Sequence, residues 1–243
     1  MRAGLFSFAV APLTRNKRAM TLSPLGDSAV VVALGTGLDE LMLLRVRALA
    51  EALTRDLPAG VVDVVPAFAS VTVFYDPVRI GDYAQLCATI EARAARADAG
   101  MLTQESRRIE IPVCYGGAFG PDLAAVAAHS YLSAARVVEL HSGADYLVHA
   151  IGFAPGFAYL GGLPGKIHTP RRATPRTSVP AGSVGIGGEQ TGVYPLTTPG
   201  GWNLIGRTPL AMFDATRAEP ALLRVGDRVT FRAISTEEFT AWK

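Results

Sequence analysis

The segment Val179–Trp202 reads VPAGSVGIGGEQTGVYPLTTPGGW, and 7 of its residues are glycine. The longer stretch 143–206 holds 14 of the 25 glycines and 7 of the 16 prolines in the chain. Glycine and proline at this frequency interrupt helices, so this region must form short strands joined by tight turns. Many short strands with glycine at their corners indicate a β-barrel or a β-sandwich.

Four short apolar runs supply candidate strands for this β-rich part, and Gly226-Asp227 predicts a hairpin turn before the last of them. The predicted strands are Leu147–Ile151, Ser183–Ile186, Leu210–Phe213 and Val229–Ala233. Two short helices are predicted upstream. One begins near Asp122, whose charge favours the positive end of a helix, and the other is Ala134–His141, capped by Ser133.

The N-terminal part alternates between the two apolar periods that distinguish strands from helices. In chain order it predicts strand Ala29–Leu34, helix Asp39–Leu57, strands Val61–Val65 and Val71–Tyr75, helix Asp82–Ala95 and strand Arg108–Cys114. This order matches the split βαβ, ferredoxin-like unit. The pattern leaves open whether the last strand completes this unit or begins the next one.

Charge and composition limit the classes of function. The chain has 243 residues and a formal charge of +2, but residues 1–19 carry four basic residues and no acid, so the remainder is at −2. That balance excludes a dedicated nucleic-acid binder, and no apolar run approaches the length of a membrane span. Cys87 and Cys114 are too few for a disulfide scaffold, which predicts a cytoplasmic protein. We expect 1–19 to be a disordered extension, or an upstream start with Met20 as the native one, because its apolar run lacks a signal-peptide cleavage site.

The glycine-rich segment also carries the residues with the clearest chemical potential. Ser183, Gln190, Thr191, Tyr194 and Thr198 alternate with glycines that let a backbone approach a ligand closely. The alternative is that these glycines only make barrel corners. The segment is neither a P-loop nor a dinucleotide fingerprint, because the following lysine and the strand–helix context are missing.

Three arginines and a group of aromatic residues precede this segment. We interpret Arg171 and Arg176 as ligands for a carboxylate or phosphate, and Arg172 as a solvated surface residue. The aromatic residues Phe153, Phe157 and Tyr159 line a pocket or fill one end of the barrel. The four histidines lack metal-ligand spacing, so no metal site is predicted. His141 falls in the last turn of a predicted helix, where the dipole favours an imidazolium, so we weigh a structural role for it at least as heavily as a catalytic one.

Several longer motifs of the sequence resemble those of a known family. They are YGGAFGPDL at 115–123, VVELHS at 137–142, IGFAPGFAYLGGLP at 151–164, HTPRRATPR at 168–176, and the segment 179–206. In this order they resemble the B subunits of bacterial ATP-dependent 5-oxoprolinases, the KipI-like or allophanate hydrolase subunit 1 family with carboxyltransferase subdomains C and D. The resemblance covers roughly residues 20–235.

The resemblance implies an α+β protein with an α/β domain at 20–107 and a cyclophilin-like β-barrel domain at 108–243. It implies two partner proteins of an oxoprolinase complex, a C-like barrel protein and an A-like protein. It also implies ATP with Mg as its counter-ion, and the opening of 5-oxoproline to glutamate by a complex in which this chain is inactive alone. Carried over by position, the catalytic residues are Gln190, Arg176 and Tyr194. The implied binding residues are Arg171, Gly182, Ser183, Thr191, Gly192, Phe157 and Tyr159.

Two other functions stay open at this point. Some KipI-like proteins are inhibitors of a sensor histidine kinase, a role that needs no active site. Related barrels also form a carboxyltransferase half-domain in urea carboxylase and allophanate systems. The chain lacks a Met-Lys-Met biotin signature and a Ser-rich amidase signature, which argues against independent carboxylase or amidase activity.

Overall fold

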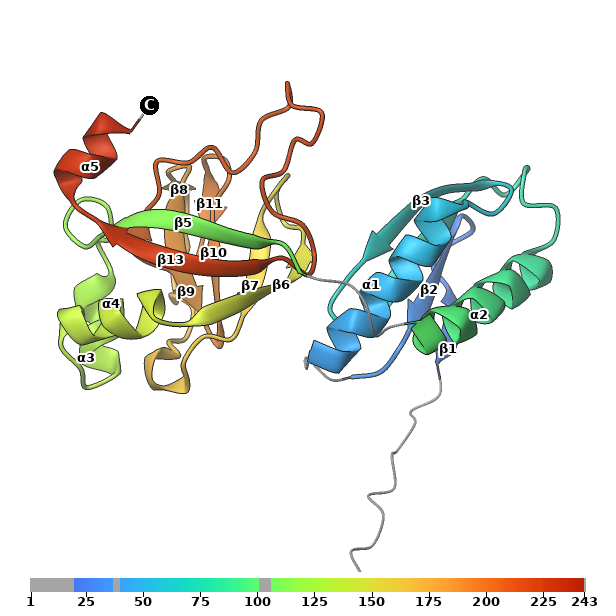
Figure 1. Cartoon of the computed structure of the whole chain (residues 1–243), viewed down its shortest axis with the longest axis horizontal. Helices are drawn as coiled ribbons and strands as arrows, with labels where there is room; N and C mark the ends of the chain where they lie inside the picture. Colours follow the sequence, from blue (N-terminus) through green and yellow to red (C-terminus); the bar gives the residue numbers. More distant parts are fainter. Residues whose placement is uncertain (1–19, 37–39, 101–105, 243) are drawn as a thin grey trace, which may run out of the picture.

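A computed structural model describes residues 20–36, 40–100 and 106–242 of the chain. It contains two units, each with its own hydrophobic core, which lie side by side in Figure 1. The N-terminal core uses residues between Val30 and Ala94, and the C-terminal core uses residues between Ile111 and Phe231. The expectation for residues 1–19 lies outside the described part of the chain.

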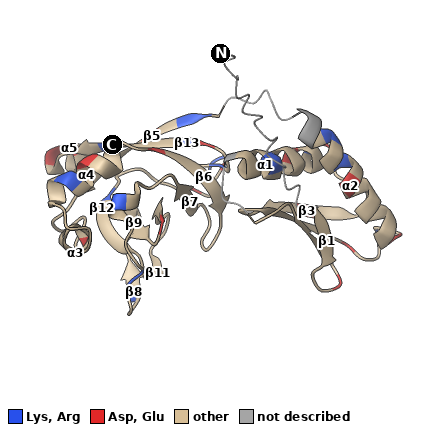
Figure 2. Cartoon of the chain, turned by 90° about the horizontal axis from the view of Figure 1, so that it is seen from below, with Lys and Arg blue, Asp and Glu red and all other residues tan. Residues whose placement is uncertain are grey.

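The N-terminal unit is a four-stranded antiparallel sheet with the order β1-β2-β4-β3. Its elements are β1 Thr21–Pro24, β2 Ala29–Ala33, α1 Glu40–Arg55, β3 Val61–Pro66, β4 Ser70–Tyr75 and α2 Tyr83–Gly100. The two helices cover one face of the sheet (Figure 2). Strand β1 was not predicted, because its short sequence TLSP has neither apolar alternation nor strand-forming residues throughout.

The apolar stripe of α1 differs from the one that the sequence suggested. The sequence predicts a stripe of Leu41, Leu44, Ala48 and Ala52, with Met42, Val46, Leu49 and Leu53 beside it. In the structure Leu41 is 49% exposed, whereas Leu43, Val46 and Leu53 are each 1% exposed or less. The spacing of these three residues keeps one face of the helix against the sheet. The helix is therefore rotated from the predicted orientation, because a continuous apolar run is compatible with several stripes.

The C-terminal unit is a closed seven-stranded barrel with the order β10-β7-β6-β13-β5-β12-β9. Its strands are β5 Arg108–Tyr115, β6 Asp145–Ile151, β7 Ala158–Gly161, β9 Ser183–Gly187, β10 Gln190–Val193, β12 Asn203–Arg207 and β13 Arg228–Ile234. Strand β5 pairs in parallel with β13, so the predicted strand Arg108–Cys114 belongs to the barrel. The edge position beside β2 in the N-terminal sheet is held by β1.

Helices α3 Leu123–His129 and α4 Ala134–Ser142 connect β5 to β6, and the Ser133 side chain accepts a hydrogen bond from the backbone N–H of Arg136, as predicted. The predicted strand Leu210–Phe213 is wrong. This segment makes only an isolated bridge between Phe213 and Ala221. Helix α5 Thr236–Ala241, which begins with a capping box, was not predicted. A short 3-10 helix, Gly165–Ile167, follows β7.

A two-stranded ribbon, β8 Arg176–Val179 paired with β11 Thr198–Gly200, lies outside the barrel wall. It is seen beside β9 and β10 in Figure 1. Val179 of β8 packs with Phe157, Tyr194, Trp202 and Leu204 in an apolar cluster separate from the barrel core, so the barrel wall has an inner face toward the core and an outer face toward the ribbon. The candidate site lies on the outer face.

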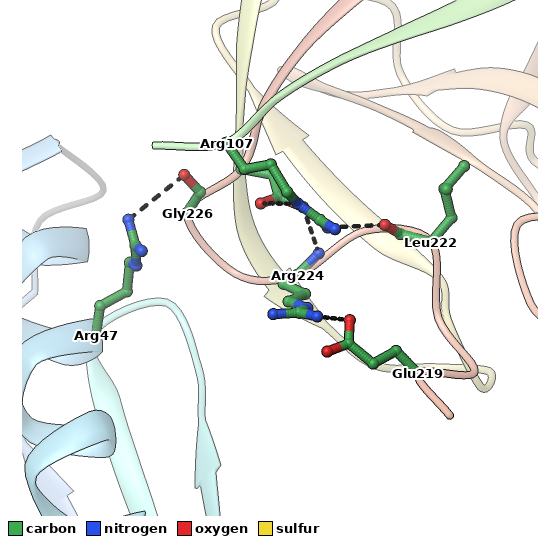
Figure 3. A network of polar contacts seen from close by, with 7 residues as sticks. Arg47, Arg107, Glu219, Leu222, Arg224 and Gly226 are labelled. Atoms are coloured by element: carbon green, nitrogen blue, oxygen red, sulfur yellow. Dashed lines mark hydrogen bonds and ion pairs between the residues drawn. The ribbon is translucent and has the colours of Figure 1, made fainter. Parts of the chain in front are cut away.

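Among the described residues, the N-terminal unit contacts the barrel unit through α1 and through the turn between β3 and β4. From α1, Arg47 reaches the carbonyl oxygen of Gly226 at 3.5 Å (Figure 3). The turn that contains Gly226 is held on the other side by Arg107, whose guanidinium binds Asp227. At the second place Phe68, on the turn between β3 and β4, packs edge-on against Tyr159 with ring centroids 5.7 Å apart. The N-terminal unit therefore contacts the outer aromatic face of the barrel.

In the view of Figure 2, Lys and Arg positions are interspersed with Asp and Glu positions along both units. Within residues 20–36, 40–100 and 106–242, no helix is both long enough and apolar enough to cross a membrane.

Candidate functional site

Successive side chains along β9 and β10 point to opposite faces of the barrel wall, and this alternation separates core residues from site residues. Val184, Ile186 and Val193 point into the barrel core and are 1% exposed or less. Gly185 and Gly192 alternate with them and lie against the side chain of Trp202 on the outer face. The hairpin therefore places the glycine-rich segment under a large aromatic ring.

These glycines make room for aromatic rings. A Cβ atom at Gly187 would lie 2.5 Å from Nε1 of Trp202, and one at Gly192 would lie 2.8 Å from the Ala158 carbonyl oxygen. A Cβ at Gly200 would lie 2.4 Å from the Tyr194 hydroxyl oxygen. The predicted close approach of backbone to a ligand is thus, in this structure, a close approach of backbone to Trp202 and Tyr194.

The aromatic residues form one cluster on the outer face of the barrel. The centroid of the Phe157 ring lies 4.9 Å from that of Tyr159, 5.2 Å from that of Tyr194 and 5.5 Å from that of Trp202. All three pairs have edge-to-face geometry. Such geometry is favourable because ring edges are positive and ring faces negative. We call Phe157, Tyr159, Tyr194 and Trp202 the aromatic cluster. The aromatic cluster lies on the outside of the barrel wall and does not fill an end of the barrel.

Phe153 extends the aromatic cluster and carries an unusual backbone. It has a φ of 68° and is 63% exposed, and its ring lies 5.4 Å from Phe157. A left-handed conformation is costly for a non-glycine residue and is concentrated at functional sites. The exposed ring therefore marks the edge of the aromatic cluster as a surface available to a ligand or partner.

Tyr194 is buried beneath the ribbon. Burial raises the pKa of its hydroxyl, while the backbone N–H of Trp202 and the charges of Arg171 and Arg176 act in the opposite direction. The hydroxyl therefore remains protonated near neutral pH, and its oxygen lies directly against the backbone of Gly200 in β11. This arrangement ties β10 to the segment that follows β11.

Arg171 lies over the aromatic cluster with its guanidinium carbon 5.8 Å from the centre of the Trp202 ring. Its side chain is on the surface of the loop. A cation over a tryptophan face is attracted by the ring quadrupole. Arg171 is thereby held near the aromatic cluster and remains exposed to solvent.

Asp122 joins three segments that are distant in the sequence. Its carboxylate accepts hydrogen bonds from Arg172 at 3.0 Å, from Arg176 at 2.8 Å and from the backbone N–H of Leu204 at 2.7 Å. The Asp122 side chain is only 6% exposed. Arg172 is exposed, as expected of a surface residue, but its guanidinium also pairs with this buried carboxylate, which the interpretation from the sequence did not include. Asp122 also does not cap α3 as expected of an acid at a helix start, because these partners occupy it.

A surface hollow of about 460 Å³ opens beside this carboxylate, over the loop 169–174. Its polar lining comes from two arginines, one histidine and three uncharged side chains. These residues are His129, Thr169, Arg171, Arg172, Thr174 and Asn203. We call this feature the arginine hollow.

The remaining predicted site residues divide between the two faces of the barrel wall. Gln190 is half-buried at the start of β10, where it pairs with Gly187. Thr191 points the opposite way and binds His141 Nε2 and the Gly185 carbonyl oxygen, each at 2.9 Å. Gly182 has a φ of 81° and lies against Thr208, and Ser183 next to it is buried. The structure thus brings Gln190, Gly192 and Tyr194 to one face with Arg171, and leaves Thr191 in the core.

The structure adds three residues that sequence reasoning did not assign to the site. Asp122 was interpreted only as a helix-start residue, and neither Trp202 nor Asn203 was selected. Asn203 donates to the carbonyl oxygens of Pro170 and Ile186, so it holds the loop against β9. A tryptophan directly after two glycines was the available signal for Trp202, whereas nothing near Asp122 in sequence indicates its arginine partners.

His141 is the central polar residue of the barrel core. Its ring lies 2.8 Å from the Tyr115 hydroxyl through Nδ1 and 2.9 Å from Thr191 through Nε2. Complete burial lowers the pKa of His141 to about 3. The imidazolium expected from the helix dipole is therefore wrong, because the cost of desolvating the charge exceeds the benefit of the dipole.

This low pKa predicts how stability depends on pH. The unfolded imidazole, with a pKa of 6.5, binds a proton that the folded one does not accept until about pH 3. Stability is therefore lost as the pH falls from 6.5 toward 3, and His141 alone should lower the free energy of unfolding by about 2 kcal/mol between pH 7 and pH 5. Urea unfolding of the His141→Gln variant at both pH values should show a shallower dependence. His129→Gln, an exposed control, should keep the full slope, and equal slopes for both variants would contradict the assignment.

Within the described residues, no group of three or more histidine, cysteine, aspartate and glutamate side chains is placed to hold a metal ion. Cys114 is buried and Cys87 is partly buried.

The chain matches one family model and several characterised proteins. The model of the carboxyltransferase domain, subdomain C and D, matches residues 20–223. A protein of Escherichia coli O157:H7, named as the B subunit of 5-oxoprolinase, is 52% identical over 207 residues, which are 85% of this chain and 93% of that protein. The Bacillus subtilis (strain 168) protein of the same name is 43% identical over 231 residues, which are 91% of this chain and 96% of that one.

A solved structure shares the architecture. The crystal structure of TTHA0988 matches with a TM-score of 0.75 and 39% sequence identity, and the match covers 85% of this chain. It covers 39% of the TTHA0988 chain, so this chain spans about two fifths of that longer one.

Proposed function

Because this chain belongs to the family of the carboxyltransferase domain, subdomain C and D, we propose that it is the B subunit of a 5-oxoprolinase. The observation that carries the proposal is the match, over most of both lengths, to proteins named as 5-oxoprolinase B subunits at 43% and 52% identity. In this proposal the chain works within a hydrolase complex with A-like and C-like proteins, and has no turnover alone.

The proposed reaction explains why ATP would be needed. A lactam is a poor electrophile, and transfer of the γ-phosphoryl group to its carbonyl oxygen creates a leaving group. Water adds to that carbon and the ring C–N bond breaks, which gives an acyl phosphate of glutamate with its amine free. A second water molecule then hydrolyses the acyl phosphate, so that phosphate leaves and glutamate results. The reaction develops and moves negative charge, which fixed cations stabilise best in a site that excludes water.

The outer face of the barrel offers residues that suit this chemistry. Arg171 carries a solvent-facing charge above Trp202, and Gln190 lies on the same face with an amide able to donate and accept. The described lining of the arginine hollow contains no carboxylate, which suits the phosphates of ATP, and the Mg ion would enter with the nucleotide. We propose that the partner proteins complete the site across this face.

We also propose the finer description of the fold. Strands β2 and β3 run in the same direction on either side of β4, and α1 connects them. This is the arrangement of a ferredoxin-like unit, and β1 takes the edge position that the fourth strand usually holds. For the barrel, seven closed strands with helices α3 and α4 inserted support a cyclophilin-like unit. A cytoplasmic location would suit a chain with two free cysteines.

The proposal is tested by reconstitution. The purified chain is mixed with the A-like and C-like proteins, ATP and 5-oxoproline, and glutamate and ADP are measured. We expect glutamate only in the complete mixture, with a rate at least about a hundredfold above that without this chain. Gln190→Ala and Arg176→Ala should each lower the rate by about tenfold or more, because each removes a polar group near the developing charge.

The control for these variants is their folding, followed by circular dichroism and thermal unfolding. A rate that is the same with and without this chain would rule out the subunit role. Inhibition of sensor-kinase autophosphorylation by the chain, unchanged in Gln190→Ala, would then favour the KipI-like alternative. Neighbouring genes for A-like and C-like proteins are an inexpensive first indication of the enzyme role.

A further inference from the structure

The arginine hollow has an excess of positive charge. Arg171 and Arg172 line it and Arg176 lies beside it, and among the described residues Asp122 supplies the one carboxylate that contacts this group. Glu189 lies on the turn beside Gly188, which pairs with Thr169, but it does not line the hollow. Three arginines against one carboxylate leave a net excess of two positive charges here, and Arg171 has no carboxylate partner in the described part of the chain.

The geometry of the guanidinium groups leaves donors available. Arg172 uses one nitrogen, Nη1, for Asp122, so the rest of its planar fork is directed elsewhere. Arg171 contacts the face of Trp202 and forms no ion pair with any residue in the described ranges. Planar guanidinium groups match the geometry of carboxylate and phosphate oxygens in pairs.

A buried donor nearby points to the same conclusion. Nη1 of Arg176 is buried and has no hydrogen-bond partner in the described structure, while Nη2 of the same group binds Asp122. Leaving a charged donor desolvated and unpaired is costly. A nearby negative charge would lower that cost even without touching this nitrogen atom.

We propose that the arginine hollow is an oxyanion site that binds a phosphoryl or carboxylate group through Arg171 and Arg172. Asp122 is the positioning residue: it holds Arg172 and Arg176 at the hollow and neutralises only part of their charge. The binding of an oxyanion does not depend on the proposed function, but its assignment to ATP phosphate or to the 5-oxoproline carboxylate does.

The experiment uses the full chain without partners. Trp202 lies under Arg171, so its fluorescence reports on the hollow, and a Trp242→Phe background removes the other tryptophan of the chain. Inorganic phosphate, 5-oxoproline and the uncharged lactam 2-pyrrolidinone are titrated separately. We expect a saturable change with phosphate or 5-oxoproline and none with 2-pyrrolidinone. Saturation by phosphate alone identifies a phosphoryl site, and saturation by 5-oxoproline alone identifies a carboxylate site.

Variants separate binding from structure. Arg172→Gln and Asp122→Asn should each raise Kd by about tenfold or more, and the double variant should be no weaker than Arg172→Gln, because Asp122 acts through the arginine. Asp145→Asn is the matched control, since this exposed carboxylate pairs with Arg108 and Arg228 elsewhere. It should leave Kd unchanged. If Asp122→Asn does not fold, Arg172→Lys, which keeps the charge and loses the fork, should still weaken binding.

Two results would overturn the oxyanion site. One is the absence of saturable binding by phosphate and by 5-oxoproline, and the other is unchanged binding in Arg172→Gln. A chain that binds an oxyanion but does not support turnover in the reconstituted mixture would overturn the subunit role and leave the site standing.

Discussion

Replacing Trp202 with alanine should lower the free energy of unfolding by about 3–5 kcal/mol, which is a large share of the stability of an ordinary domain. The side chain is 5% exposed and contacts Phe157, Tyr159 and Arg171. Gly185, Gly187 and Gly192 lie against its ring or its Cβ, and without side chains they cannot fill the space that it leaves.

The measurement is urea unfolding followed by circular dichroism at pH 7. Trp242→Ala is the matched control, because Trp242 is 41% exposed beyond α5 and should cost less than about 0.5 kcal/mol. The Trp202→Ala variant should also disturb Arg171, which rests on the ring. A loss no larger than that of Trp242→Ala would show that the aromatic cluster is not the support of this face.

The Arg171→Gln variant should lower kcat/KM of the reconstituted 5-oxoprolinase by about tenfold to a hundredfold. The charge faces the proposed site, and glutamine keeps a polar side chain of similar length without it. Folding should be unaffected, because the exposed guanidinium contacts only the face of Trp202 in the described structure.

Arg217→Gln provides the comparison for this result. Arg217 pairs with Asp214 on the surface of a loop that the site does not use. Its removal should leave kcat/KM within about twofold of the unaltered chain, as for most surface changes. Equal rates for Arg171→Gln and Arg217→Gln would remove Arg171 from the site and would leave the role of the chain in the complex untouched.

Local patterns were sufficient for most of the elements. Helices α1 and α2 follow apolar periodicity, and Ser133 caps α4 as its sequence indicates. The glycine and proline content of 143–206 correctly excluded long helices there. Strand β1 and the loop around Phe213 could not be predicted, because each depends on pairing with a distant segment more than on its own residues.

The candidate site shows a sharper division. Gln190, Tyr194 and Arg171 could be selected as polar or aromatic residues in a glycine-rich context, and they share one face of the barrel wall. Thr191 could not be separated from them by composition. Its place in the core follows from the alternation along β10 and from the bond to His141, which is 50 residues away.

The sequence by itself determined that the second unit is rich in β-strands, that the first contains both helices and strands, and to which family the chain belongs. These properties depend on the local spacing of residues and on long sequence motifs. Tertiary structure alone decided which glycines face Trp202, that His141 stays neutral and that Asp122 binds two arginines. The Asp122 partners lie 50, 54 and 82 residues away along the chain. Burial and electrostatic pairing depend on distance in space, and the closure of the barrel brings these residues together.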